Sequence, residues 1–166
     1  VFISNIKYQI AKIHIKYLIF SLCILFFIFN FLYFLNQYFV QQNYFNSKDW
    51  QYGYEKTISK VKEIERKYDK IIVSNKPYLD QSYMFFLFYL KYSPLKYQEE
   101  TQYSSGGFAE NHKFGKFEFR TIEWDKEIRD SKILYIGTPS DFPVGVRIIK
   151  SINFLDGNPA IVMVEN

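Results

Sequence analysis

The feature that most constrains this chain is a run of nineteen uncharged residues from Tyr17 to Leu35. No charge occurs anywhere between Lys16 and Lys48. At about 1.5 Å per residue, a helix of this length is roughly 28 Å long, close to the hydrocarbon thickness of a bilayer. A buried helix of a soluble core rarely lacks a polar stripe over such a length, and no small-residue cleavage site of a signal peptide follows. The sequence therefore predicts a transmembrane helix over residues 17–40.

The flank before this run predicts the direction in which the helix crosses. Lys7, Lys12 and Lys16 lie there with no acidic residue near them. Short positive flanks stay in the cytoplasm, whereas long domains cross largely regardless of charge. We therefore expect residues 1–16 to be a cytoplasmic flank or a loop between spans. Residues 48–166 should be extracytoplasmic, in a protein integral to the cytoplasmic membrane.

Polar and aromatic side chains in and just after the run indicate what the helix contacts in the membrane. Tyr33, Phe34, Tyr38 and Phe39 would place ring bodies in the acyl region and polar tips among the headgroups. Asn30, in the middle of the span, costs free energy in lipid unless its amide is hydrogen bonded, and we expect a neighbouring helix to supply that bond. The predicted partners are the lipid bilayer and other transmembrane helices.

Composition excludes several classes of protein. Aromatic residues make up 21% of the chain, with 7 Gly and 5 Pro, so the chain should fold rather than stay disordered. All 17 acidic residues and all but three of the 21 Lys and Arg follow the apolar run, which leaves that part nearly neutral. We therefore expect no nucleic acid partner. The single cysteine, Cys23, lies inside the run, so no disulfide framework is expected.

Hydrophobic periodicity after the run predicts an α/β domain. The uncharged residues 41–47 are expected to be a link. A spacing of three and four residues then predicts an amphipathic helix whose apolar face is Trp50, Tyr54, Ile58, Val61, Ile64 and Tyr68. Further helices are expected at 81–92 and 95–102. Strands are expected at 70–74, 117–124, 132–137, 147–154 and 160–164. The turn residues 155–159 make the last two a terminal antiparallel hairpin of a small mixed sheet of about five strands.

The chain carries no motif for phosphate, dinucleotide or zinc binding and no nucleophile elbow. Glu110 and His112 could form an acid/base pair or two metal ligands, but two residues do not complete a site and a solvated loop is favoured. Gly106 and Gly107 are expected to give only flexibility to the loop 104–107. We therefore assign no catalytic, cofactor-binding or metal-binding residue.

Other charged residues have simpler explanations. Asp80, directly before Gln81 and Ser82, is expected to cap the following helix, because its carboxylate can accept from unpaired backbone N–H groups. The remaining acidic candidates alternate with lysine and arginine or lie on a helix face, as exposed charges do. They are Glu99, Glu100, Asp125, Glu127 and Asp130.

Packing and turn residues carry a family resemblance. They are Trp50-x-Tyr52-Gly53-Tyr54, Lys67–Val73, Phe85–Tyr89, Phe114–Arg120, Leu134–Pro139 and Asp156-Gly157-x-Pro159-Ala160. With the apolar helix before them, over residues 15–166, they resemble the C-terminal end of multispanning bacterial membrane glycosyltransferases of the GT-C type. Among these, the chain is similar to protein O-mannosyltransferases and lipid A aminoarabinose transferases, of the glycosyltransferase family 39 kind.

The resemblance implies an enzyme that transfers a sugar from a polyprenyl-phosphate donor to an extracytoplasmic acceptor. In that family the catalytic acid lies in the first extracytoplasmic loop, which has no counterpart in this sequence. The chain begins with Val1-Phe2-Ile3 rather than Met, so we expect a C-terminal fragment, inactive alone, that comprises the last span and a capping domain. Its apolar helix 83–89 could face the rest of the enzyme, although core packing is favoured.

Composition and periodicity alone favour a different class of protein. In a non-enzymatic bitopic protein, one helix anchors an extracytoplasmic binding or interaction domain. This alternative needs only the single span that the sequence contains.

Overall fold

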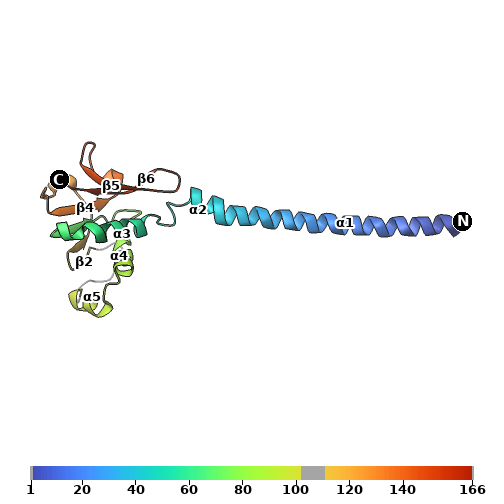
Figure 1. The fold of residues 1–166 in the computed structure, drawn as a ribbon, viewed down its shortest axis with the longest axis horizontal. Coiled ribbons are helices and arrows are strands. Elements are labelled where there is room, and N and C mark those ends of the chain that lie inside the picture. The colour runs from blue at the N-terminus through green and yellow to red at the C-terminus, as the bar shows by residue number, and fades with distance from the viewer. Residues whose placement is uncertain (1, 102–110, 166) are drawn as a thin grey trace. The chain divides into compact units, whose positions relative to one another are not determined.

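The computed structural model describes residues 2–101 and 111–165. It divides into two compact units, Val1–Asn43 and Tyr44–Asn166 (Figure 1). The described residues of the first unit are helical. The second unit is a mixed β-sheet with packed helices, which confirms the expected α/β class.

Helix α1, Phe2–Asn36, accounts for most of the first unit. It continues through a π-helical turn, Gln37–Gln41, into a short helix α2, Gln42–Phe45. Within the described residues, Lys12–Phe45 is the one helical stretch long and apolar enough to cross a membrane. The expected link at residues 41–47 is therefore wrong for its first five residues, which are helical.

Two side-chain amides in this segment each donate a hydrogen bond to the backbone of their own helix. Asn30 Nδ2 donates to the carbonyl oxygen of Phe26 at 2.8 Å, and Asn43 Nδ2 donates to that of Phe39 at 2.9 Å. Both bonds join residues four apart along the helix. Each amide therefore has one partner in its own helix, and the expectation that a neighbouring helix bonds to Asn30 stays a prediction.

The second unit is built on a six-stranded sheet with the order β2-β3-β1-β4-β6-β5. Strand β1 pairs in parallel with β3 and β4, and the other pairs are antiparallel. The strands are β1 Lys70–Val73, β2 His112–Phe114, β3 Phe117–Phe119, β4 Ile133–Gly137, β5 Ile148–Asn153 and β6 Pro159–Val164. The mixed sheet and the β5–β6 hairpin are as expected.

The sheet has one strand more than the sequence predicts. Strand β2 has only three residues and pairs antiparallel with β3, so that Phe114 lies opposite Phe117. The turn between them is Gly115-Lys116, in which Gly115 has a φ of 51° that favours glycine. A strand this short has too few residues to show an alternating pattern.

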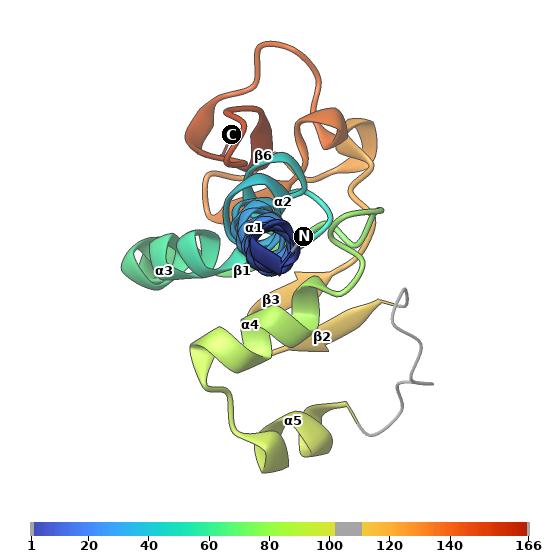
Figure 2. The same ribbon diagram turned by 90° about the vertical axis from the view of Figure 1, so that its right-hand side faces the viewer.

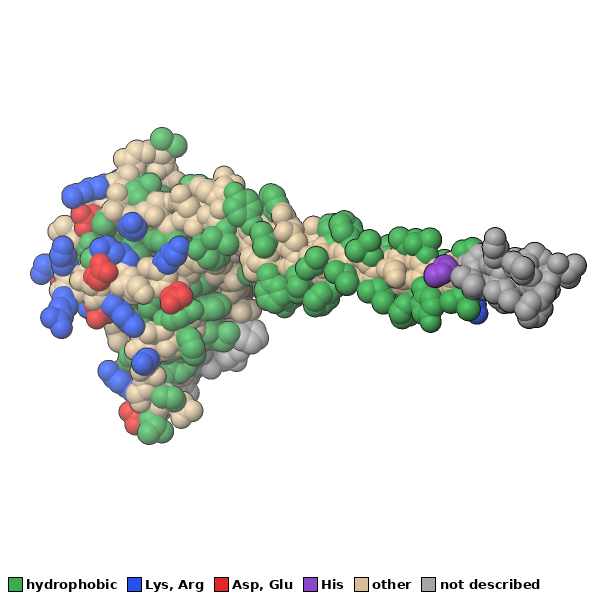
Figure 3. All heavy atoms as spheres, turned by 45° about the vertical axis from the view of Figure 1, so that its right-hand side comes forward, with side chains coloured by type: hydrophobic (Ala, Val, Ile, Leu, Met, Phe, Trp, Pro, Cys, Tyr) green, Lys and Arg blue, Asp and Glu red, His purple; other side chains and the backbone are tan. Residues whose placement is uncertain are grey.

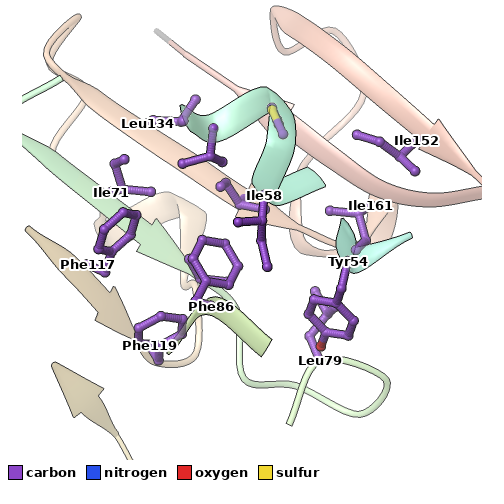
Figure 4. Close-up of a cluster of buried hydrophobic side chains, with 14 of the residues drawn as sticks. Tyr54, Ile58, Ile71, Leu79, Phe86, Phe117, Phe119, Leu134, Ile152 and Ile161 are labelled. Atoms are coloured by element: carbon purple, nitrogen blue, oxygen red, sulfur yellow. The ribbon is translucent and has the colours of Figure 1, made fainter. Parts of the chain in front are cut away.

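One face of the sheet is covered by α3, Tyr54–Ile64, and α4, Ser82–Leu90. Figure 2 shows α4 in front of β2 and β3, and Figure 4 shows Ile58 of α3 and Phe86 of α4 pointing into the same cluster of buried side chains. The ring of Phe86 lies 5.6 Å from that of Phe117 and 5.3 Å from that of Phe119. The amphipathic helix is therefore confirmed at its centre.

Three details at the ends of these elements differ from expectation. Trp50 precedes α3 and is 66% exposed, so it lies outside the apolar face. The residue before α4 is Gln81, and Asp80 makes no cap to that helix. Helix α5, Pro94–Glu100, is instead capped by Ser93, whose side chain accepts from the backbone N–H of Lys96.

The opposite face of the sheet is covered by irregular chain rather than by helices. Strand β3 ends at Phe119, where residues 117–124 were expected to stay extended. The chain then folds back, so that Ile122 and Trp124 pack on Tyr135 of β4. Trp124 begins a 3₁₀ turn, Trp124–Lys126. Burial of these two apolar side chains against the sheet explains why the strand stops early.

Candidate functional site

The parallel strands β1, β3 and β4 end at the same edge of the sheet, here called the carboxyl edge. From β1 the chain reaches β3 through α4, which packs on one face. From β3 it reaches β4 through the turn of Trp124, which packs on the other face. The strands β3 and β4 lie on opposite sides of β1, so the order of the strands reverses at β1. In α/β sheets, ligands bind at such a switch point, outside the carboxyl ends of the strands. The carboxyl edge is therefore the first place to look for a site.

A buried carboxylate organises this edge. Asp141 ends the 3₁₀ turn η4, Pro139–Asp141, which follows β4, and its side chain is fully buried. Its Oδ2 accepts from the backbone N–H of Thr138 at 2.8 Å and from the Thr138 hydroxyl at 2.9 Å. Its Oδ1 lies 2.8 Å from the Nζ of Lys76, in the loop after β1. One carboxylate thus joins the ends of the two central strands.

Gly137, the last residue of β4, makes room for this carboxylate. A Cβ at that position would lie 2.7 Å from Asp141 Oδ2 and 3.1 Å from the ring of Phe142. No flexible side-chain end can move away there, because Asp141 is fixed by three polar contacts. The glycine is therefore needed for close approach.

A pocket of about 640 Å³ opens at the carboxyl edge, and we call it the Tyr78 pocket. Its wall combines the loops after β1 and β4 with the β5–β6 turn and with Lys48, near the start of the domain. The lining residues are Lys48, Lys76, Pro77, Tyr78, Thr138, Pro139, Ser140, Phe154, Asp156, Asn158, Pro159 and Ala160. The sequence analysis singled out none of these for chemistry.

Tyr78 is the most unusual residue of the pocket. Its φ is 79°, in the left-handed region, and its side chain is 51% exposed. Its carbonyl oxygen accepts a hydrogen bond from the hydroxyl of buried Tyr54 at 3.4 Å, and the Nζ of Lys48 lies 4.3 Å from its ring centroid. The contact with Tyr78, together with Asp49 and Asp156, raises the pKa of Lys48. Lys48 is therefore a cation at the rim of the pocket.

His112 lies elsewhere and corrects an expectation. It is a residue of strand β2 and only 4% exposed, not part of a solvated loop. Its ring stacks on Tyr83 of α4, with 3.7 Å between centroids, and its Nδ1 lies 3.3 Å from the hydroxyl of Tyr97. Burial raises the pKa of both tyrosines. Glu110, the proposed partner, and the loop 104–107 lie outside the described residues.

Glu127 also differs from its expected role as a solvated charge. Its side chain is 7% exposed, and both carboxylate oxygens accept hydrogen bonds from the guanidinium of Arg120. Arg120 also donates to Glu118 at 2.9 Å, and Glu118 pairs with Lys70. The bonds from Arg120 lower the pKa of Glu127. This network holds the chain after β3 on the sheet, and we give it a structural role.

The other acidic candidates are exposed. Asp125 and Asp130 lie on the surface, as does Glu99, while Glu100 accepts from the Tyr92 hydroxyl at 2.8 Å and from the Gly115 backbone N–H at 3.0 Å. Among residues 2–101 and 111–165, no group of three or more His, Cys, Asp or Glu side chains is arranged to hold a metal ion.

Comparison of the chain with models of protein families, with curated proteins and with solved structures finds no match. The site is therefore interpreted from its own geometry. That geometry is a pocket of about 640 Å³ at the switch point of an α/β sheet, lined by an aromatic ring and several fixed polar groups.

Proposed function

We propose that this chain is the last span and the extracytoplasmic domain of a membrane glycosyltransferase of the GT-C type. The whole enzyme would move a sugar from a polyprenyl-phosphate donor to an acceptor outside the cytoplasm. In this proposal the domain caps the reaction site and helps to hold the acceptor or the neighbouring loops. It supplies no catalytic residue of its own.

The observation that carries the membrane part of the proposal is the exposure of α1. Four successive residues, Tyr17 to Phe20, are each 56–67% exposed, so apolar side chains cover every side of the helix. Figure 3 shows the same hydrophobic cover along its visible face. An apolar surface of this extent is unfavourable in water, whereas a helix with its backbone groups paired is stable in lipid.

The glycosyltransferase part rests on the resemblance, and the positions of its residues support it. Phe86 and Phe117 form the centre of the core, Gly115 makes the β2–β3 turn, and Gly137 admits the Asp141 carboxylate. These four residues lie in the core or at tight turns, whereas Trp50 and Phe88, which also carry the resemblance, are exposed. The support is therefore a shared set of packing and turn positions.

The second candidate is a bitopic binding protein without enzymatic activity. One observation favours it: the described residues contain a single candidate span, and the Tyr78 pocket would serve a binding domain as well as a cap.

The full gene product distinguishes the two. Its coding sequence upstream of Val1 should contain several apolar spans and an acidic residue in the first extracytoplasmic loop. Membrane vesicles holding that product should discharge a radiolabelled sugar from polyprenyl phosphate, and vesicles holding a version without residues 48–166 should do so more slowly. A start codon close to Val1, or no discharge above that of empty vesicles, would favour the bitopic protein.

A further inference from the structure

We propose that the Tyr78 pocket binds a pyranose ring, with Tyr78 as the surface on which the sugar stacks. The proposal deepens the proposed function, on which it rests for the source of the sugar. A volume of about 640 Å³ falls in the range of about 300–1,000 Å³ found for small-molecule sites.

The conformation of Tyr78 is the first argument. A non-glycine residue with a φ of 79° is strained by about 1 kcal/mol. Glycine would adopt this conformation without strain, and the backbone bond from Tyr54 to the carbonyl oxygen would remain. Apart from the Lys48 ammonium over one face, the half-exposed ring recovers little free energy by burial, and its other face is the one on which a sugar would stack. Its presence is explained if the ring contacts a ligand, since strained residues gather at ligand sites.

The charge of the pocket selects a neutral ligand. Lys76 is paired with Asp141 at 2.8 Å, and Lys48 and Asp156 line the same pocket. The two cations are thus matched by two carboxylates. A free phosphate or a nucleic acid would need an excess of positive charge, which these groups do not provide.

The fixed polar groups suit hydroxyl groups on a ring. The Thr138 hydroxyl donates to Asp141, so the Ser140 hydroxyl, 2.8 Å away, donates to Thr138 and keeps its own oxygen free to accept. Both carboxylate oxygens of Asp156 are held by Asn158. Lys76 can donate its remaining protons. A sugar presents hydroxyls that both donate and accept, and an apolar C–H face attracted by the negative face of an aromatic ring.

Saturation-transfer NMR on the full chain in lipid nanodiscs tests the proposal. The probes are methyl glycosides of glucose, galactose, mannose and N-acetylglucosamine, each at about 20 mM, which detects a Kd in the millimolar range. At least one should receive saturation from the protein. The Tyr78→Phe variant should bind within twofold of the unchanged chain, whereas Tyr78→Ala should bind about five to ten times more weakly.

Two further variants control for folding and for non-specific contact. Tyr78→Gly relieves the backbone strain, and its unfolding curve beside that of the unchanged chain separates a loss of binding from a loss of folding. Phe88→Ala removes a 75% exposed ring of α4 that lies outside the pocket, and it should bind as the unchanged chain does. Binding by Tyr78→Gly at full strength, or no saturation of any glycoside, would overturn the proposal.

The same experiment with hexose 1-phosphates identifies the source of the sugar. Equal or weaker binding of the phosphorylated sugar points to an acceptor saccharide, as the charge of the pocket predicts, whereas tighter binding would contradict the choice of a neutral ligand and point to the lipid-linked donor. The two experiments can fail independently. If the protein binds glycosides but discharges no donor, the pocket is the saccharide site of a binding protein and the glycosyltransferase proposal is wrong. If it discharges the donor but binds no glycoside, only the proposal for the pocket is wrong.

Discussion

Asp141 shows how one side chain can hold the carboxyl edge together. Replacement by Asn keeps the shape but removes the charge that faces Lys76. Oδ1 meets Lys76 as an ion pair and not as a hydrogen bond, and the lysine is partly exposed, so Asp141→Asn should lower the free energy of unfolding by about 1 kcal/mol. Trp124 reports the change, because its ring lies 5.2 Å from that of Phe142, the next residue.

The measurement is denaturant unfolding of the full chain in detergent, followed by tryptophan fluorescence. The matched control is Asp125→Asn, which removes an exposed carboxylate near the same tryptophan and should change stability by less than about 0.5 kcal/mol. Equal stability of Asp141→Asn and the unchanged chain would show that the Lys76 ion pair contributes nothing.

Glu127 predicts a pH dependence at the residue scale. Its pKa in the folded domain is below the unfolded value of about 4.3, because Arg120 donates to both carboxylate oxygens. Its contribution is therefore present above about pH 4.3 and is lost as the pH falls through the folded pKa. At pH 7, Glu127→Gln should be less stable than the unchanged chain by about 1.5–3 kcal/mol.

The gap should narrow as the pH falls from 7 through the folded pKa of Glu127, because the native carboxylate is then protonated as well. Comparing the two proteins at each pH cancels the titration of other groups, and Glu99→Gln, at an exposed position, should show no gap at any pH. A gap of the same size at every pH would mean that the ion pair is not its cause.

At the scale of elements, α4 offers a direct comparison of its two faces. Phe86 is fully buried between the rings of Phe117 and Phe119, whereas Phe88, two residues later, is 75% exposed. Phe86→Ala should cost about 3–5 kcal/mol and Phe88→Ala less than about 0.5 kcal/mol, both measured by unfolding in detergent. Similar losses from both would contradict the packing of α4 on β3.

The elements that the sequence predicts well are those with a long pattern. The spacing of apolar residues in α3 indicates both a helix and its buried face, and the β-branched run of β1 indicates a buried strand. Both predictions are confirmed. Strand β2 could not be found, because three residues carry no period. His112 is covered by the ring of Tyr83, which is 29 positions earlier in the chain. The residues next to His112 in the sequence therefore could not predict its burial.

The candidate site was harder to predict than the fold. Lys76 and Asp141 are 65 positions apart and meet only because β1 and β4 are parallel neighbours. Thr138-Pro139-x-Asp141 does carry a local signal, since threonine followed three residues later by an acid is the pattern of a capping box. The sequence reveals that turn, but not the pocket beside it.

At the scale of the whole molecule, the exposed apolar side chains of α1 need lipid around them. Lys12–Phe45 combines a length sufficient to cross a bilayer with apolar side chains on every side. The direction of crossing is a proposal that rests on the three lysines before the apolar run. Placement of the domain outside the cytoplasm follows from that direction.

Labelling of Cys23 tests this requirement most directly. It is the one cysteine of the chain and is exposed on α1. A membrane-impermeant maleimide should fail to label it in intact or permeabilised cells, and should label it fully once SDS dissolves the membrane. Rapid labelling in permeabilised cells before SDS is added would place α1 in water and contradict the account.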